Sequence, residues 1–398
     1  MRKEKRVLRN KSVLLGVTGG VAAYKAVDLI RRLREEGTSV TVIMTEAAKK
    51  FVTPLSLEIA SQNRVYSDPF SDPMIHITLP AHADIMVIAP ATANTIAKFA
   101  KGIADNLLST CLLSFTGKIV IAPSMNWRMY ENPIFQDNLK YLLSRGIIQV
   151  GPERGSLACG EEGMGRMSET AEIIETIKSA LSPKDLTREK VIVTAGPTRE
   201  YLDPIRFVSN RSSGKMGYAI ARAALRRGAE VTLISGPSAL SQPRGVKFVS
   251  VETAVEMFDA VNQELSSSTV LVMSAAVSDF MPAQRAEEKI EKSEELLLRL
   301  SQTPDILSEI GKREDRPFVI GFAAETGKKI ERARRKLKEK NMDMIVLNDV
   351  TKAGSGFDVD TNSVVIHDRE KEISLPLLSK DSVAEAILDR LVQLRAPT

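Results

Sequence analysis

The sequence predicts an α/β protein with two domains, each built on a doubly wound parallel sheet. Two observations carry this prediction. A β-rich run, a glycine turn, an amphipathic helix and a second β-rich run follow one another near the start of the chain, and the same order begins again near residue 190. Alternating strands and helices are typical of a parallel sheet that has helices on both faces.

The first half contains the longer alternation. An amphipathic stretch follows Gly19-Gly20 and ends at Gly37, so the first two strands and the helix between them form a right-handed βαβ unit. The expected elements are strand 13–18, helix 22–36, strand 40–44, strand 85–89, helix 92–101, strand 119–122 and helix 133–145. This half therefore predicts a Rossmann-like domain.

The second half repeats the pattern after a short polar segment that contains the helix-breaking Pro183. Its opening elements are expected at strand 191–196, helix 217–228 and strand 230–235. The sequence thus predicts a first domain at residues 1–182, a linker at 183–189 and a second Rossmann-like domain at 190–398.

Composition excludes several classes of protein. Of 398 residues, 43% are hydrophobic and 26% charged, which is the balance of a globular protein with a sizeable core. No apolar run approaches the roughly 20 residues that span a bilayer, and the basic N-terminus lacks the apolar stretch of a signal peptide, so we expect a cytoplasmic protein. A net charge of +5, with lysine and arginine interleaved with glutamate, does not indicate nucleic acid.

Polar residues in the first half follow the ends of the predicted strands. Gly19-Gly20 could let the backbone approach a phosphate or could form a structural turn. Pro90-Ala91-Thr92-Ala93-Asn94 and Asn126 follow two further strands, where side chains meet a ligand in this fold, although each could equally be a helix cap or a turn residue. His76 could share this site or be a packed surface residue.

The two cysteines have different expected roles. Cys159 lies in a loop flanked by glycines, where a thiol could donate a proton, whereas Cys111 lies in an apolar helical run and is expected in the core. Neither belongs to a Cys-x-x-Cys pair, and two cysteines cannot form a disulfide framework.

In the second half, residues 209–217 crowd hydroxyls, glycines and cations before a helix, as an anion-binding site requires. The spacing of a Walker P-loop is absent. Asp279 follows an apolar strand, where its carboxylate could hold Mg²⁺ on a nucleotide or cap a turn. Lys289 and Lys292 could bind an anion or belong to a solvated charge run.

In this order, the motifs resemble the bacterial bifunctional phosphopantothenoylcysteine decarboxylase/phosphopantothenate-cysteine ligase family over nearly the whole chain. The first half resembles the flavin-containing cysteine decarboxylases, and the second half resembles the CTP-dependent ligase. The motifs that carry the resemblance are His76-Ile77-Thr78-Leu79, Pro123-Ser124-Met125-Asn126, Asp203-Pro204-Ile205-Arg206, residues 210–217 and Gly321-Phe322-Ala323-Ala324-Glu325-Thr326.

The resemblance implies FMN, Mg²⁺ and the co-substrate CTP. The residues that it implies for FMN are Gly19, Gly20, Thr45, Pro90, Thr92 and Asn94. Those that it implies for CTP are Met273, Ser274, Ala275, Asp279, Lys289, Thr303, Pro304, Asp305, Ile306, Phe322, Lys336 and Lys340, with Asp279 holding the metal. The implied catalytic residues are His76, Asn126, Cys159, Asn210 and Lys289.

The resemblance also implies the reactions. The ligase activates 4'-phosphopantothenate as an acyl-cytidylate, which cysteine attacks with release of CMP. FMN then accepts electrons from the thiol of 4'-phosphopantothenoylcysteine, and the resulting thioaldehyde lets CO₂ leave. His76 acts in oxidation and decarboxylation, Asn126 binds the carboxylate and Cys159 protonates the enethiolate. Ligase-domain dimers and decarboxylase-domain trimers are implied.

Two other readings of the sequence differ in class. One is a flavoprotein in which one half has lost catalysis and only binds, against which the presence of all five implied catalytic residues argues. The other is a nicotinamide-dependent dehydrogenase, but the Gly-x-Gly-x-x-Gly fingerprint with its acidic partner is missing.

Overall fold

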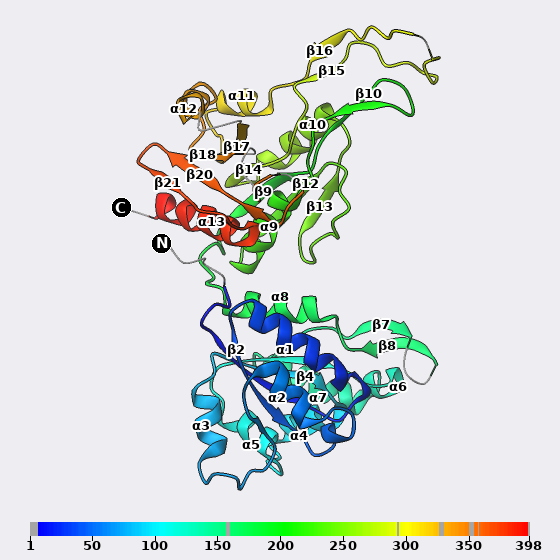
Figure 1. Cartoon of the computed structure of the whole chain (residues 1–398), viewed down its shortest axis with the longest axis vertical. Helices are drawn as coiled ribbons and strands as arrows, with labels where there is room; N and C mark the ends of the chain where they lie inside the picture. The colour runs from blue at the N-terminus through cyan, green and yellow to red at the C-terminus, as the bar shows by residue number, and fades with distance from the viewer. Residues whose placement is uncertain are drawn as a thin grey trace. The chain divides into compact units, whose positions relative to one another are not determined.

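The computed structural model describes residues 7–156, 160–292, 294–325, 330–349, 354–356 and 358–396. The chain divides into two compact units, one formed by residues 6–182 and one that contains residues 183–398 (Figure 1). Across the described part of the chain, every helix is too short or too polar to cross a bilayer.

The first unit is built on a parallel sheet with the strand order β3-β2-β1-β4-β5-β6. Its strands are β1 (Ser12–Val17), β2 (Ser39–Met44), β3 (Val65–Tyr66), β4 (Ile85–Ala91), β5 (Lys118–Pro123) and β6 (Ile148–Gln149). Chain order reverses between β1 and β4, which is where doubly wound sheets open a crevice for ligands at the carboxyl ends of the strands.

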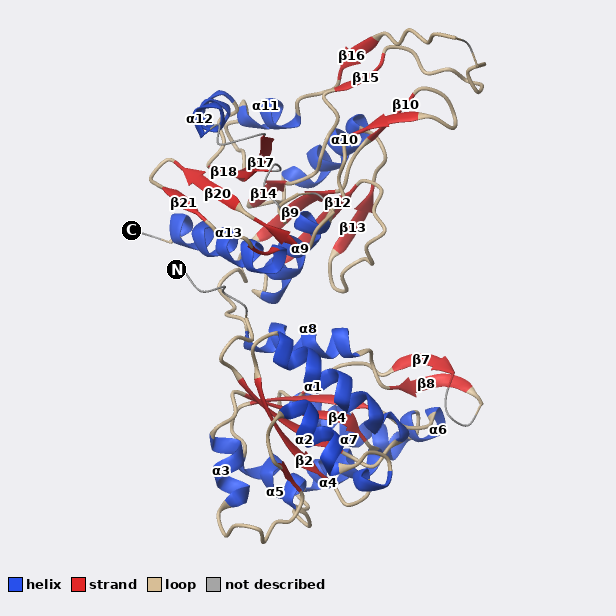
Figure 2. Cartoon of the chain, in the orientation of Figure 1, coloured by secondary structure: helices blue, strands red, loops and turns tan. Residues whose placement is uncertain are grey.

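Helices cover both faces of this sheet (Figure 2). They are η1 (Val21–Tyr24), α1 (Lys25–Glu35), η2 (Ala48–Lys50), α2 (Pro54–Ser61), α3 (Ile75–Ala81), α4 (Ala93–Lys101), α5 (Leu107–Ser114), α6 (Trp127–Tyr130), α7 (Pro133–Ser144) and α8 (Thr170–Leu181). An antiparallel hairpin of β7 (Glu153–Ser156) and β8 (Glu162–Arg166) lies outside the sheet.

Side chains of each strand alternate between two cores. Val13 and Leu15 of β1 pack in the cluster that contains side chains of α1, α2 and α8, whereas Leu14 packs in the cluster with α4, α5 and α7. The prediction that Cys111 belongs to the core is confirmed, because the residue is fully buried on α5. Burial raises the pKa of the Cys111 thiol to about 12.

The second unit has a larger sheet with the strand order β13-β12-β9-β14-β17-β18-β20-β21. Its strands are β9 (Lys190–Ala195), β12 (Glu230–Ser235), β13 (Lys247–Ser250), β14 (Val270–Met273), β17 (Phe318–Glu325), β18 (Met344–Asp349), β20 (Val364–Asp368) and β21 (Glu372–Ser374). The first six in this order are parallel, and β20 and β21 add an antiparallel edge. Chain order reverses between β9 and β14.

Helices α9 (Lys215–Arg226) and α13 (Lys380–Arg395) pack on one face of this sheet, and α10 (Ala254–Leu265), α11 (Ile306–Gly311) and α12 (Ile330–Glu339) pack on the other. Antiparallel pairs lie outside it. They are β10 (Arg199–Tyr201) with β11 (Phe207–Ser209), β15 (Phe280–Pro282) with β16 (Leu300–Gln302), and β19 (Thr361–Asn362) with β22 (Leu378–Ser379).

Buried ion pairs attach α13 to its surroundings. The Nε and Nη2 atoms of Arg390 donate to the two carboxylate oxygens of Asp368 at 2.7 and 2.9 Å, and the two side chains are 5% and 1% exposed. The buried Arg227 of α9 donates to Asp185 at 2.9 and 2.7 Å and to Asp389 of α13 at 3.0 Å. Neither ion-pair group was expected from the sequence.

The predicted doubly wound α/β class is confirmed for both units. The helix expected at residues 22–36 is divided into η1 and α1, and the one expected at 217–228 is α9, which begins two residues earlier at Lys215. The hairpins and the antiparallel edge were not predicted. Alternation of strand and helix identifies the parallel core, but it gives no information about short antiparallel strands outside that core.

Candidate active sites

A cavity of about 960 Å³ lies at the carboxyl ends of β1, β4 and β5 in the first unit. Five of the residues implied for FMN line this cavity: Gly19, Gly20, Thr45, Thr92 and Asn94. Asn126, one of the implied catalytic residues, lines it as well. It therefore occupies the crevice expected where the order of strands reverses.

The ends of β1 and β4 are joined by one hydroxyl. Thr18 Oγ1 donates to the Pro90 carbonyl at 2.7 Å and accepts from the Thr92 amide at 3.1 Å. Pro90 itself is not among the described residues that line the cavity. Gly19 has to be glycine, because a Cβ there would lie 2.4 Å from the Cβ of Ala47, which also lines the cavity.

Asn126 is the N-cap of α6, and its Oδ1 accepts from the Arg128 amide at 2.9 Å. The β7–β8 hairpin packs against this turn, since the Met125 amide donates to the Gly165 carbonyl at 3.0 Å. A Cβ at Gly165 would lie 2.1 Å from the Met125 carbonyl oxygen, so this approach requires glycine. Cys159 lies outside the described residues, in the segment that connects β7 to β8.

Two lysines that line this cavity form ion pairs. Lys25 Nζ lies 3.1 Å from Glu169, and Lys98 Nζ lies 2.5 Å from Asp105. These hydrogen bonds lower the pKa of both carboxyls below their ordinary values. The cavity thus presents cations together with apolar side chains such as Met129, a combination that suits a phosphorylated ring compound.

His76 lies on α3 and is not among the described residues that line this cavity. Its carbonyl accepts from Ser114 Oγ at 2.6 Å, which joins α3 to α5. The structure therefore brings Asn126 to the implied FMN residues and leaves His76 apart from them within one chain.

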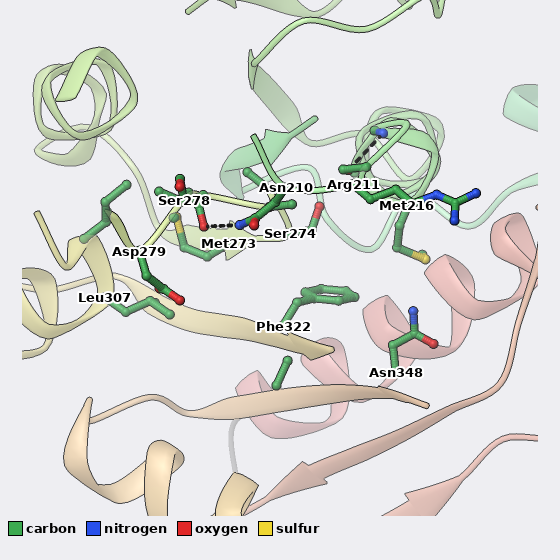
Figure 3. A pocket seen from close by; sticks show the side chains of 18 of the residues that line it. Asn210, Arg211, Met216, Met273, Ser274, Ser278, Asp279, Leu307, Phe322 and Asn348 are labelled. Carbon is green, nitrogen blue, oxygen red and sulfur yellow. Dashed lines mark hydrogen bonds between the residues drawn. The ribbon is translucent and has the colours of Figure 1, made fainter. Parts of the chain in front are cut away.

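A second cavity, of about 880 Å³, lies at the carboxyl ends of β14, β17 and β18, beside residues 210–217, which lead into α9. Among the residues implied for the ligase, those that line it are Asn210, Met273, Ser274, Ala275, Asp279, Thr303, Pro304, Asp305, Ile306, Phe322, Lys336 and Lys340. In Figure 3, Phe322 projects into the cavity between Asp279 at one end of the view and Asn348 at the other.

Short hydrogen bonds hold the walls of the second cavity. Asn210 Nδ2 donates to the Val277 carbonyl at 2.8 Å, and Ser274 Oγ donates to the Thr194 carbonyl at 2.7 Å. Thr303 Oγ1 donates to the Ser278 carbonyl at 2.6 Å, so the loop after β16 is fixed to the loop after β14.

At one end of this cavity Lys340 pairs with Asp305, with Nζ 2.9 and 3.0 Å from the two carboxylate oxygens. Burial alone would raise the pKa of Asp305, but the hydrogen bonds from Lys340 and Ser308 outweigh it and hold the pKa below its ordinary value. Within the described residues, no group of three or more His, Cys, Asp or Glu side chains could hold a metal ion. Asp279 is an exposed single carboxylate, which suits Mg²⁺ that is also bound by substrate phosphates.

Lys289 is exposed on the segment between β15 and β16 and is absent from the described lining of the second cavity. The adjacent Ile290 amide donates to Asp203 Oδ2 at 3.2 Å. Asp203 is fully buried and also accepts from the Ile205 and Arg206 amides at 2.8 and 2.7 Å. Burial alone would raise the pKa of its carboxyl, but the three amides hold that pKa below its ordinary value.

Both halves of the chain match known protein families. The family model of the DNA/pantothenate metabolism flavoprotein C-terminal domain matches residues 186–394, and the flavoprotein model matches residues 1–182. The coenzyme A biosynthesis bifunctional protein CoaBC of Vibrio cholerae is 45% identical over 390 residues, which cover 96% of this chain and 98% of that protein. The CoaBC protein of Bacillus subtilis is 43% identical over 406 residues, covering 98% and 99% of the two chains. This chain belongs to the CoaBC family.

A solved structure of the C-terminal domain of a CoaBC protein is also similar, with 42% sequence identity and a TM-score of 0.46, over 53% of this chain and 97% of that one. The two family models and the CoaBC relatives confirm, at the level of the family, the resemblance inferred from the sequence motifs.

Several cavity residues of this CoaBC chain were not singled out from its sequence. Lys25, Lys98 and Arg166 line the first cavity, and Lys380 lines the second. A signal for Lys380 was available, because it is the first residue of α13 and a cation at a helix N-terminus opposes the helix dipole. The signal for Lys380 is therefore an unfavourable charge at the start of a helix.

Proposed function

We propose that this CoaBC protein joins cysteine to 4'-phosphopantothenate in residues 190–398 and decarboxylates the product, 4'-phosphopantothenoylcysteine, in residues 1–182, with residues 183–189 as the linker. The family membership supports a bifunctional enzyme of coenzyme A biosynthesis. One structural observation supports the assignment of sites: apart from Pro90 and Lys289, the residues implied for FMN and for CTP line two separate cavities, each at a point where strand order reverses.

The first cavity fits FMN. Its volume is sufficient, Gly19 and Gly20 leave room at the end of β1, and Thr45, Thr92 and Asn94 offer polar side chains close to that turn. Pro90 supports the wall through Thr18. FMN, when bound, would supply an acceptor for the electron pair of the substrate thiol. Unless the thiol is oxidised in this way, the carbanion left by loss of CO₂ has no group to delocalise its charge.

Within the decarboxylase, Asn126 lies on this cavity and would bind the substrate carboxylate, because an amide donates hydrogen bonds without bringing a charge. Cys159 would protonate the enethiolate. His76 lies outside the cavity of its own chain, so we assign it to the site of a neighbouring copy in a trimer of decarboxylase domains. Exposed apolar side chains beside it support such contacts, among them Phe70 at 89% and Met74 at 54%.

Within the ligase, CTP would occupy the second cavity, with Lys336 and Lys340 toward its phosphates. Mg²⁺ held by Asp279 and the phosphates would offset negative charge, and Asn210 would stabilise the acyl-cytidylate as cysteine attacks. Lys289 lies on an exposed segment outside this cavity, and we assign its action on CTP to the pairing of ligase domains in a dimer.

The test is to incubate the purified protein with 4'-phosphopantothenate, cysteine, Mg²⁺ and either CTP or ATP, and to follow the products by mass spectrometry. We expect 4'-phosphopantetheine with CMP, and a flavin absorption spectrum in the same sample. Accumulation of 4'-phosphopantothenoylcysteine would contradict an active decarboxylase. Absence of nucleotide cleavage with both nucleotides would contradict the ligase.

A pair of variants tests the role of Lys289. Lys289→Gln is expected to abolish formation of the acyl-cytidylate, whereas Lys292→Gln, a matched change at an exposed lysine three residues away, is expected to preserve it. Normal acyl-cytidylate in Lys289→Gln would refute the assignment.

A further inference from the structure

One carboxylate fastens the β7–β8 hairpin to α6. Glu161 lies directly before β8, and its Oε2 accepts from Trp127 Nε1 at 2.8 Å while its Oε1 accepts from Arg128 Nη2 at 2.7 Å. The guanidinium of Arg128 also lies over the Trp127 ring, 5.3 Å from the ring centre. Side chains that are 33 and 34 residues from Glu161 in the sequence therefore meet at its carboxylate.

The hairpin also packs on the indole ring of Trp127. A Cβ at Gly163 of β8 would lie 2.6 Å from the Trp127 Cβ, so this approach requires glycine. The Trp127 side chain is partly buried, and its N–H is a donor that needs an acceptor in such a place. Glu161 supplies that acceptor, so packing and a hydrogen bond together hold the hairpin on α6.

This contact lies between two residues that the proposed decarboxylase uses. Asn126 is the N-cap of α6, directly before Trp127, and lines the first cavity. Glu161 follows Cys159 by two residues in the sequence. Two residues of fully extended chain span about 7 Å, so an anchor at Glu161 restricts the reach of the segment that carries Cys159.

The other end of β8 is attached by contacts that do not involve Glu161. The Met125 amide donates to the Gly165 carbonyl at 3.0 Å, and the Arg128 amide donates to Asn126 Oδ1 at 2.9 Å. Removal of the Glu161 carboxylate should therefore leave Asn126 and the wall of the cavity in place. Only the end of the hairpin that is next to Cys159 in the sequence should be released.

We propose that Glu161 is a positioning residue of the decarboxylase, which holds the segment that carries Cys159 to α6 for the protonation step. The inference rests on the proposed function and adds to it a residue that is not among the described residues lining the first cavity. The hydrogen bond from Trp127 carries most of the effect. The side chains of Arg128 and Glu161 are 68% and 38% exposed, and an ion pair in water contributes little.

The first test follows a single turnover of 4'-phosphopantothenoylcysteine by the full chain and measures CO₂ release and 4'-phosphopantetheine formation separately. In Glu161→Ala, 4'-phosphopantetheine should form about tenfold to hundredfold more slowly, because a shift of about 1 Å in a reacting group can cost about a hundredfold in rate. CO₂ release and the flavin absorption spectrum should stay as in the wild type. Glu162→Ala is the matched control and should behave as the wild type, since Glu162 is exposed and its carboxylate has no hydrogen bond or ion pair with the described residues.

Conservative variants separate positioning from a loss of folding. Glu161→Gln keeps an acceptor oxygen for the Trp127 indole and should keep most of the wild-type rate, as should Arg128→Gln. Trp127→Phe keeps an aromatic ring against Gly163 but lacks the donor, so it should be as slow as Glu161→Ala. The double variant Glu161→Ala/Trp127→Phe should be no slower than either single variant, because both changes remove the same hydrogen bond.

A second test needs no catalysis. Trp127 is the only tryptophan of the chain, so the tryptophan fluorescence of the flavin-loaded protein reports on this contact alone. In Glu161→Ala, the emission should move to longer wavelength and acrylamide should quench it more strongly, because the indole gains contact with water. In Glu161→Gln and Glu162→Ala, both properties should stay as in the wild type.

The outcomes separate this inference from the proposed function. If the wild type decarboxylates its substrate but Glu161→Ala forms 4'-phosphopantetheine at the wild-type rate, or slows CO₂ release equally, the positioning role is refuted and the decarboxylase stands. If the wild type releases no CO₂, the decarboxylase and the positioning role are both refuted. Unchanged Trp127 fluorescence in Glu161→Ala would refute the contact itself, whatever the activity.

Discussion

Replacing Arg390 by methionine is expected to destabilise the second unit strongly. Arg390 joins α13 to β20 through two hydrogen bonds to Asp368, and both side chains are almost fully buried. Burial alone would raise the pKa of Asp368, but the hydrogen bonds from Arg390 and from the Glu370 and Lys371 amides hold it below its ordinary value. Without the guanidinium, a buried carboxylate loses its only charged donor among the described residues.

The expected loss follows from the contacts that remain. Breaking a buried ion pair from one side typically costs 3–5 kcal/mol, and we expect about 3 kcal/mol because the two amides still donate to Asp368. A unit of this size changes its Tm by about 2–4 °C per kcal/mol, so Arg390→Met should lower the Tm of the second unit by roughly 6–12 °C.

Calorimetric unfolding of the full chain measures this change, and Arg395→Met provides a control in the same helix. Arg395 is 35% exposed and pairs with Glu189 at 3.0 Å. A partly exposed pair contributes under about 1 kcal/mol, so its loss should lower the Tm by no more than about 4 °C. The double variant Arg390→Met/Asp368→Asn should recover part of the lost stability, since it removes the uncompensated charge.

The stabilisation by the Arg390–Asp368 ion pair should depend on pH. Because the pKa of Asp368 is lowered by folding, the stabilisation is present above the unfolded pKa of about 3.9 and is lost as pH falls through the folded value. The difference in Tm between wild type and Arg390→Met should therefore shrink in acid. Equal Tm values for Arg390→Met and Arg395→Met at neutral pH would refute the reasoning.

Two further predictions concern the sites. Asp203→Asn is expected to slow acyl-cytidylate formation, because Asp203 anchors the segment next to Lys289; an unchanged single-turnover rate would show that this anchor is dispensable. Gly19→Val should abolish flavin retention, which the absorption spectrum of the purified protein reports, since even a Cβ at this position would collide with Ala47.

The parallel core could be predicted because the sequence pattern of each strand–turn–helix unit is local. A buried strand, a glycine turn and an amphipathic helix are each visible within about fifteen residues, and β1 with α1 and β9 with α9 were found in this way. Residues at strand ends, such as Thr92 and Ser274, reach the cavities because the carboxyl ends of parallel strands share one edge of the sheet. For these residues sequence position fixes location in space.

The remaining features depend on contacts between distant segments. His76 and Lys289 could be named through family resemblance, but nothing in their neighbouring residues says that they lie outside the cavities of their own chain. Lys215 and Lys380 are 165 residues apart in the sequence (380 − 215). They line one cavity only because α13 packs beside α9. Asp203 reaches Ile290 across an interval of 87 residues.

The burial of Cys111 has a practical consequence. Thiol reagents attack the thiolate, which is negligible near neutral pH when a thiol is buried and its pKa is about 12. The chain has only two cysteines, so a dye or spin label taken up by the native protein is attached at Cys159 by elimination. The unmodified chain can thus carry a single spectroscopic reporter in the segment between β7 and β8, and its signal can be followed as flavin and substrate are added.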